Sequence, residues 1–111
     1  MSTRRAELTI APDHPAFAGH FPAMPIVPGV VLLDLAMHAI GAQAGMDLER
    51  CEIIAVKFLS PLLPGEPACV CYDLQAGTGE NMTLRFDIMS DERKLASGTL
   101  RVSGIQISQK Q

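Results

Sequence analysis

The sequence predicts an α+β fold in which a curled antiparallel β-sheet wraps around one long central helix. One apolar segment without proline, residues 30–44, is long enough for a helix, and four segments with period-two alternation follow it. Short connections join these four segments, which is typical of antiparallel strands, and such a sheet must cover the helix to bury it. The 111 residues are too few for two ordinary domains, so we expect residues 1–111 to form a single domain.

The first strand is predicted at residues 4–10, RRAELTI, where polar and apolar residues alternate loosely. The following stretch, residues 11–29, contains several prolines and glycines, which exclude regular secondary structure. We therefore expect a strand followed by a long loop.

Residues 30–44, VVLLDLAMHAIGAQA, are apolar on nearly every side of a predicted helix. Such a helix in a globular protein is expected to be surrounded by other elements. Pro28 and Gly29 stand at its start, and Gly45 is a suitable stop signal.

The remaining strands are predicted in CEIIAVKFLS, EPACVCYDLQ, MTLRFDIMS and KLASGTLRVSGIQI, with breaks at PLLPGEP, AGTGEN and SDER. A sheet of five strands leaves open edges and exposes part of the helix. Two copies would bury more surface than one, so we expect at least a homodimer.

Composition excludes several classes of function. The net charge of -3 does not suit a nucleic acid or an anionic membrane as partner, and no apolar stretch has signal-peptide length, so we expect a cytoplasmic protein. Cys51, Cys69 and Cys71 have no matching metal ligands in the sequence, and we interpret them as packing residues rather than a metal or redox site.

Asp34 interrupts the most apolar segment of the chain, where an isolated carboxylate is costly. It could be a structural acid that accepts hydrogen bonds from backbone amides at a cleft or subunit boundary. It could equally transfer protons in a partly dry pocket, with His20 on the preceding loop as the complementary acid or base. The unpaired amides expected at the helix start near Gly29 could stabilise a carbonyl oxygen that gains negative charge. Together these groups could remove an α-proton and expel a β-hydroxyl.

Two segments resemble a known family. GHFPAMPIVPGVVLLDLAM, residues 19–37, resembles the signature GHFPGxPIxPGVLxxEAMAQ of the hotdog-fold 3-hydroxyacyl-(acyl carrier protein) dehydratases. KFLSPLLPGEP, residues 57–67, resembles the family's KFxxPVxPGD segment. Asp34 stands where glutamate is usual, and His38 where glutamine is usual. The short chain looks like the compact members of specialised pathways such as aryl-polyene assembly.

The resemblance implies a role for each matching position. His20 matches the catalytic histidine, Asp34 the catalytic acid, and Gly29 the residue whose backbone amide polarises the thioester carbonyl. The further substrate-binding positions are Phe21, Val30 and His38. In the family the histidine and the acid come from opposite subunits, and neither a metal nor a dissociable cofactor takes part.

The implied function is a hydro-lyase that eliminates water from a 3-hydroxyacyl thioester to give a trans-2-enoyl thioester, in fatty-acid or polyene/polyketide-type biosynthesis. The expected partners are an acyl carrier protein and either a second copy of the chain or a related hotdog subunit. Two alternatives stay open: a hotdog thioesterase, and a catalytically silent acyl-binding subunit that supports a partner enzyme.

Overall fold

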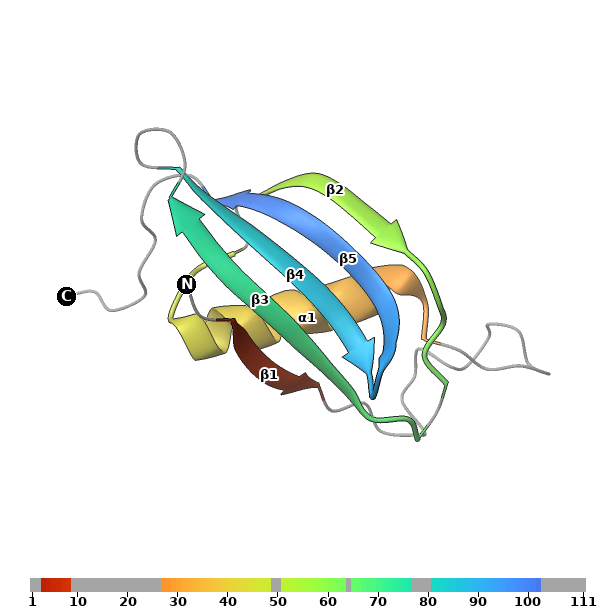
Figure 1. The fold of residues 1–111 in the computed structure, drawn as a ribbon. Coiled ribbons are helices and arrows are strands. Elements are labelled where there is room, and N and C mark those ends of the chain that lie inside the picture. Colours follow the sequence, from red (N-terminus) through yellow and green to blue (C-terminus); the bar gives the residue numbers. More distant parts are fainter. Residues whose placement is uncertain (1–2, 9–26, 49–50, 64, 77–80, 103–111) are drawn as a thin grey trace.

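The computed structural model describes residues 3–8, 27–48, 51–63, 65–76 and 81–102. They form one helix and five strands, shown in Figure 1, where the helix lies against one face of the sheet. The elements in chain order are β1 (Arg4–Leu8), α1 (Gly29–Ala44), β2 (Glu52–Phe58), β3 (Ala68–Ala76), β4 (Met82–Ser90) and β5 (Arg93–Val102). All of them lie within one or two residues of the predicted segments, except where a prediction extends beyond the described residues.

The five strands form one antiparallel sheet in the order β1-β3-β4-β5-β2. The hairpins β3–β4 and β4–β5 make up its centre, whereas β1 and β2 are edge strands, each with one neighbour. Side chains alternate between the two faces of the sheet. On the central strands β4 and β5, for example, Leu84, Phe86 and Leu100 are buried in the core, whereas their neighbours Arg85 and Arg101 are exposed.

Helix α1 ends where the sequence predicts a stop. Gly45 adopts a left-handed conformation with φ of 70° and its amide donates to the carbonyl of Gly41, an arrangement that suits glycine because it has no Cβ. The helix buries Leu32, Ala36 and Ile40 against the sheet.

The opposite side of α1 is exposed in the single chain, as expected for a sheet of only five strands, so within one chain the helix is not surrounded on all sides. Val30, Asp34, His38 and Ala42 follow one another at intervals of four residues and all are exposed. We call this row the exposed ridge. It is exposed because a single sheet can cover only one side of a helix.

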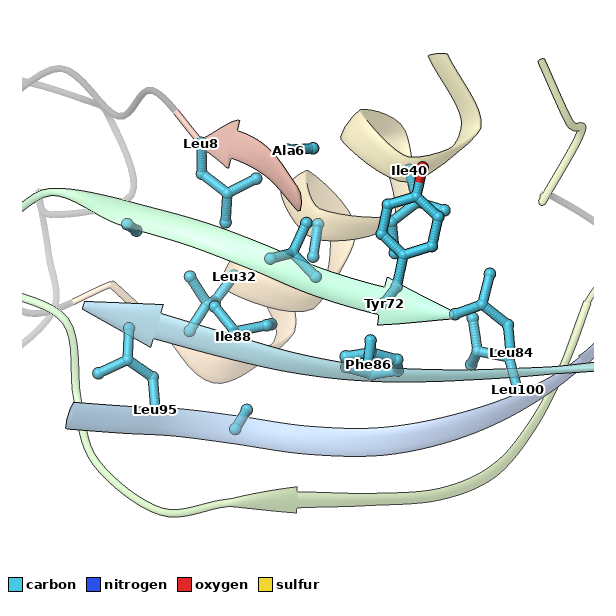
Figure 2. Packing of buried hydrophobic residues seen from close by; sticks show 14 of the residues in the cluster. Ala6, Leu8, Leu32, Ile40, Tyr72, Leu84, Phe86, Ile88, Leu95 and Leu100 are labelled. Carbon is cyan, nitrogen blue, oxygen red and sulfur yellow. The ribbon is translucent and has the colours of Figure 1, made fainter. Parts of the chain in front are cut away.

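The core lies between α1 and the sheet, as Figure 2 shows. Tyr72, Leu84, Phe86, Ile88 and Leu100 reach from the three central strands towards the helix, and each is at most 3% exposed. Close packing of this kind fixes the position of the helix relative to the sheet and therefore the direction of the exposed ridge.

A polar connection ties the helix to two strands near its C-terminal end. The Tyr72 hydroxyl donates to Gln43 Oε1 over 2.6 Å, and Gln43 Nε2 donates to the backbone carbonyl of Arg5 over 2.9 Å. Tyr72 is only 1% exposed, so this bond satisfies a buried hydroxyl. Among the described residues no helix is long and apolar enough to cross a membrane.

Candidate active site

The exposed ridge borders a cavity of about 530 Å³ that runs beside α1 and ends at the beginning of β2. We call it the helix-side cavity. Its lining residues are Asp34, Met37, His38, Gly41, Ala42, Met46, Asp47, Leu48, Cys51 and Ile53. Two of the residues selected from the sequence, Asp34 and His38, thus line the same cavity.

Asp34 and His38 are one helical turn apart, which places their side chains next to each other on the helix surface. Both are exposed in the single chain. A carboxyl and an imidazole at the wall of one cavity are groups that can take part in proton transfer to or from a ligand. Their position on the ridge makes them accessible to a ligand or to a second subunit.

The rest of the helix-side cavity is mainly apolar. Met37 belongs to the partly buried layer against the core, and Met46, Leu48 and Ile53 extend the wall beyond the end of the helix. Burial raises the pKa of the Cys51 thiol, which keeps this group neutral. A polar end at Asp34 and an apolar remainder suit a ligand with one reactive polar group and a hydrocarbon portion.

The start of α1 forms a second, smaller cavity of about 300 Å³, the helix-start cavity, lined by Val27, Gly29, Leu32, Phe58, Leu59, Ser60 and Pro61. Pro28 is the N-cap residue and no side chain in the described part of the chain bonds to the helix start. The Phe58 ring lies so close to Gly29 that a Cβ there would be 2.8 Å from the ring. Only glycine permits this approach.

The other predicted positions are placed as follows. Val30 is 76% exposed on the first turn of α1 and lines neither cavity. His20 and Phe21 lie outside the described residues, so the contact of His20 with Asp34 remains a prediction. A third cavity of about 480 Å³ lies on the outer face of the sheet and contains none of the predicted site residues.

The three cysteines differ in their surroundings, and Cys71 is half-buried and lines the cavity on the outer face of the sheet. Cys69 is buried, and Cys51 packs against the core cluster. Cys69 and Cys71 share one face of β3, and burial first, then the neighbouring Cys71, raises the pKa of the Cys69 thiol. Among the described residues no three histidine, cysteine or acidic side chains gather as metal ligands would.

Sequence comparison adds independent evidence to this geometry. The family model for ApeI-like proteins, described as ApeI dehydratase, matches residues 1–99. The chain belongs to this ApeI-like dehydratase family.

Curated relatives of this ApeI-like chain are 3-hydroxyacyl-[acyl-carrier-protein] dehydratases named FabZ. The protein from Vibrio atlanticus is 26% identical over 95% of this chain and 68% of its own length. The protein from Chlamydia trachomatis serovar D is 39% identical over 55% of this chain and 46% of its own length. The chain therefore spans about half to two thirds of the length of these relatives.

Solved structures confirm the hotdog fold predicted from the resemblance. The dehydratase heterocomplex ApeI:P from Xenorhabdus doucetiae matches with a TM-score of 0.63 and 25% identity, covering 89% of this chain and 85% of that one. The fluoroacetyl-CoA thioesterase FlK matches with a TM-score of 0.65 and 16% identity, covering 90% and 82% of the two chains. At that identity the thioesterase is evidence for the fold alone.

Several residues that line the two cavities are not predicted as site residues from the sequence. Phe58 belongs to the segment 57–67 that resembles the family, but the sequence does not mark it as a site residue, because its partner Gly29 lies far away in the chain. Met46 and Ile53 flank the end of α1 and the start of β2, and no local motif marks them. Cys51 was interpreted as packing only, although it also lines the helix-side cavity.

Proposed function

We propose that the chain is a 3-hydroxyacyl thioester dehydratase that acts on substrates carried by an acyl carrier protein. The observation that carries the proposal is the position of Asp34 at the polar end of the helix-side cavity in a member of the ApeI-like dehydratase family. The dehydratase names of the FabZ relatives favour the same reaction class.

The proposed elimination needs two proton transfers and no other reagent. His20 removes the α-proton, the electrons of that C–H bond form the double bond, and the protonated Asp34 gives its proton to the departing β-hydroxyl, which leaves as water. The amides at the start of α1, beginning with Gly29, stabilise the negative charge on the thioester oxygen. Proton transfer from His20 back to Asp34 through solvent completes the cycle.

The proposed enzyme works as an oligomer. Exposed apolar side chains gather at the helix start, on edge strand β2 and in the segment after it, and are between 42% and 76% exposed: Val30, Ile53, Ile54, Phe58, Leu59 and Leu63. Among the described strands, β2 has a neighbour on one side only, so its other edge can pair with another strand. A second hotdog subunit on this surface would cover the exposed ridge and exclude water from the reaction. This subunit is either a second copy or a related chain, as in the ApeI:P heterocomplex.

Mass spectrometry of the acyl group tests the proposal. The purified protein is incubated with a 3-hydroxyoctanoyl carrier protein beside the variants Asp34→Asn and Asp34→Glu. We expect loss of one water with the wild type, a rate about 10²- to 10⁴-fold lower with Asp34→Asn, and partial activity with Asp34→Glu, because glutamate keeps a proton donor.

Other products would reject the proposal. Release of free 3-hydroxy acid and carrier thiol would identify a thioesterase. The chain would have no dehydratase role if the substrate stayed unchanged both with the purified protein alone and with the protein plus a related dehydratase subunit.

A further inference from the structure

The helix-side cavity extends well beyond the side chain that is proposed to react. It begins at Asp34, passes His38 and Ala42 on the exposed ridge, and ends at residues on both sides of the connection between α1 and β2. A substrate whose hydroxyl meets Asp34 therefore has mainly apolar cavity space along the helix towards Ala42.

We propose that Ala42 determines how long an acyl chain this cavity accepts. The inference rests on the proposed function for the position of the reacting carbons. The part of the chain beyond the hydroxyl-bearing carbon lies along α1, passes over Ala42, and ends near Met46 and Cys51.

The chemistry of the lining favours a hydrocarbon occupant. Met37 and Met46 offer flexible thioethers that adapt to the shape of a chain, and Ile53 contributes an aliphatic wall. The thiol of Cys51 is neutral because burial raises its pKa. The polar lining residues are Asp34 and His38 at the reacting end and Asp47, which is exposed, beyond the end of the helix.

The length of the cavity indicates a medium chain. Asp34 and Ala42 are eight residues apart on one helix, which corresponds to about 12 Å at about 1.5 Å per residue. An extended chain advances roughly 1.3 Å per bond, given a carbon–carbon bond of about 1.5 Å, so on the order of nine carbons fit alongside this stretch.

Ala42 is the suitable residue to control this length. A Cβ added to its neighbour Gly41 would be 2.9 Å from the backbone oxygen of Met46, so Gly41 is required by the turn that ends the helix. Ala42 is exposed and small, and a larger side chain there would extend into the cavity without disturbing the helix.

The variant Ala42→Leu tests the inference, with Ala76→Leu as the matched control. Ala76 is exposed at the end of β3 and lines none of the three cavities. kcat/KM is measured for 3-hydroxybutyryl, 3-hydroxyoctanoyl and 3-hydroxydodecanoyl thioesters of N-acetylcysteamine. We expect Ala42→Leu to lower the value for the dodecanoyl substrate, whose last carbons reach Ala42, about tenfold or more, because several buried methylenes lose their site. The butyryl and octanoyl values should stay within about twofold, because these chains end before Ala42. Ala76→Leu should have the same kcat/KM as the wild type for all three substrates.

A thiol-labelling measurement separates this inference from the proposed reaction. The wild type is treated with N-ethylmaleimide at alkaline pH, with or without the S-tetradecyl or the S-ethyl thioether of pantetheine, and labelling is quantified for each cysteine-containing peptide. The tetradecyl probe should slow labelling of Cys51 several-fold, the ethyl probe should not, and Cys71, which lines the cavity on the outer sheet face, should be unaffected by either.

The outcomes are distinguishable. Protection of Cys51 by the tetradecyl probe in a protein that removes no water would reject the proposed function and keep the acyl-chain site. Dehydration by a protein in which Cys51 is unprotected, or in which Ala42→Leu affects all chain lengths equally, would reject the role of Ala42 and keep the function. Side chains of a second subunit would then fill the cavity.

Discussion

Gly29 illustrates how a single residue shapes the candidate site. The Phe58 ring from the end of β2 rests against the start of α1, and a Cβ at position 29 would come within 2.8 Å of two of its ring carbons. The ring is half-exposed, so it can move aside. The last residue of β2 can therefore pack against the helix start only because position 29 has no Cβ.

The double-mutant cycle of Gly29→Ala and Phe58→Ala measures this link. Gly29→Ala should destabilise the wild type, because the added methyl displaces the ring, but should be neutral or slightly stabilising in the Phe58→Ala background, where alanine favours the helix. We expect a coupling energy of about 1 kcal/mol from urea unfolding. Equal effects of Gly29→Ala in both backgrounds would show that the ring does not press on the helix start.

Single residues also show what the sequence could predict about the site. Asp34 was selected because a carboxyl in an apolar segment requires a reason, and the structure places it at a cavity together with His38. The approach of Phe58 to Gly29 could not be predicted, because it depends on how the end of β2 crosses the helix. The contact between His20 and Asp34 stays a prediction, since residue 20 is outside the described residues.

Among the elements, α1 depends on a polar connection at its C-terminal end as well as on its apolar face. Gln43 accepts a hydrogen bond from the buried Tyr72 hydroxyl and donates one to the Arg5 carbonyl, so that α1, β3 and β1 share one set of bonds. The two partners differ in exposure, since Gln43 is exposed and Tyr72 is buried.

This difference in exposure predicts the order of two substitutions. Tyr72→Phe removes the bond and leaves Gln43 able to bind water, at a cost of about 0.5–1.5 kcal/mol. Gln43→Ala leaves the buried Tyr72 hydroxyl without a partner, at a cost of about 1–3 kcal/mol. In chemical unfolding, Gln43→Ala should therefore have a lower free energy of unfolding than Tyr72→Phe. The double variant should lose less stability than the sum of the two single losses. Strict additivity would contradict the account.

The turn between β2 and β3 is attached to β5 by a second polar group. Arg93 donates to both carboxylate oxygens of Glu66, over 2.7 and 3.1 Å, and to the carbonyl of Pro61, and the Leu63 amide also donates to Glu66. The hydrogen bonds from Arg93, and then that from the Leu63 amide, lower the pKa of the Glu66 carboxyl.

The lowered pKa predicts a specific dependence on acid. A carboxyl whose pKa is lower in the folded state stabilises the fold at pH values above the ordinary glutamate pKa of about 4.3 and loses this contribution as pH falls through the folded value. Wild type and Glu66→Gln should differ in unfolding midpoint at neutral pH and converge below that range. A difference that persists unchanged into strong acid would mean that the charge of Glu66 is not responsible.

The elements themselves followed largely from their sequence patterns. The helix was predicted at residues 30–44 and is Gly29–Ala44, because its apolar run, Pro28 and Gly45 are all local signals. Exposure of part of the helix was expected from a sheet of five strands, but the residues that form the exposed ridge were not predicted, since an apolar composition does not reveal which side of the helix the sheet covers. Which side is covered depends on the order of the strands in the sheet, where β2 is an edge strand next to β5.

For the whole molecule, the apolar surface around β2 is the surface on which we propose that a second subunit binds. Ile54 lies at an irregularity in the pairing of β2 with β5 and is 45% exposed. A lysine on an open edge strand opposes pairing with another strand. Ile54→Lys should therefore sediment as a monomer, whereas Ala76→Lys should keep the oligomeric state of the wild type. An unchanged assembly in Ile54→Lys would place the subunit boundary elsewhere.

The proposed dehydratase mechanism uses Asp34 and His20. The family resemblance implies that these two residues come from opposite subunits. The most direct test mixes two inactive variants, His20→Ala and Asp34→Asn, under conditions that exchange subunits, and measures dehydration of a 3-hydroxyacyl carrier protein. In a two-fold dimer each hybrid contains one intact site, so the mixture should recover roughly a quarter of wild-type activity. No recovery, although native mass spectrometry shows that hybrids have formed, would contradict a site shared between subunits.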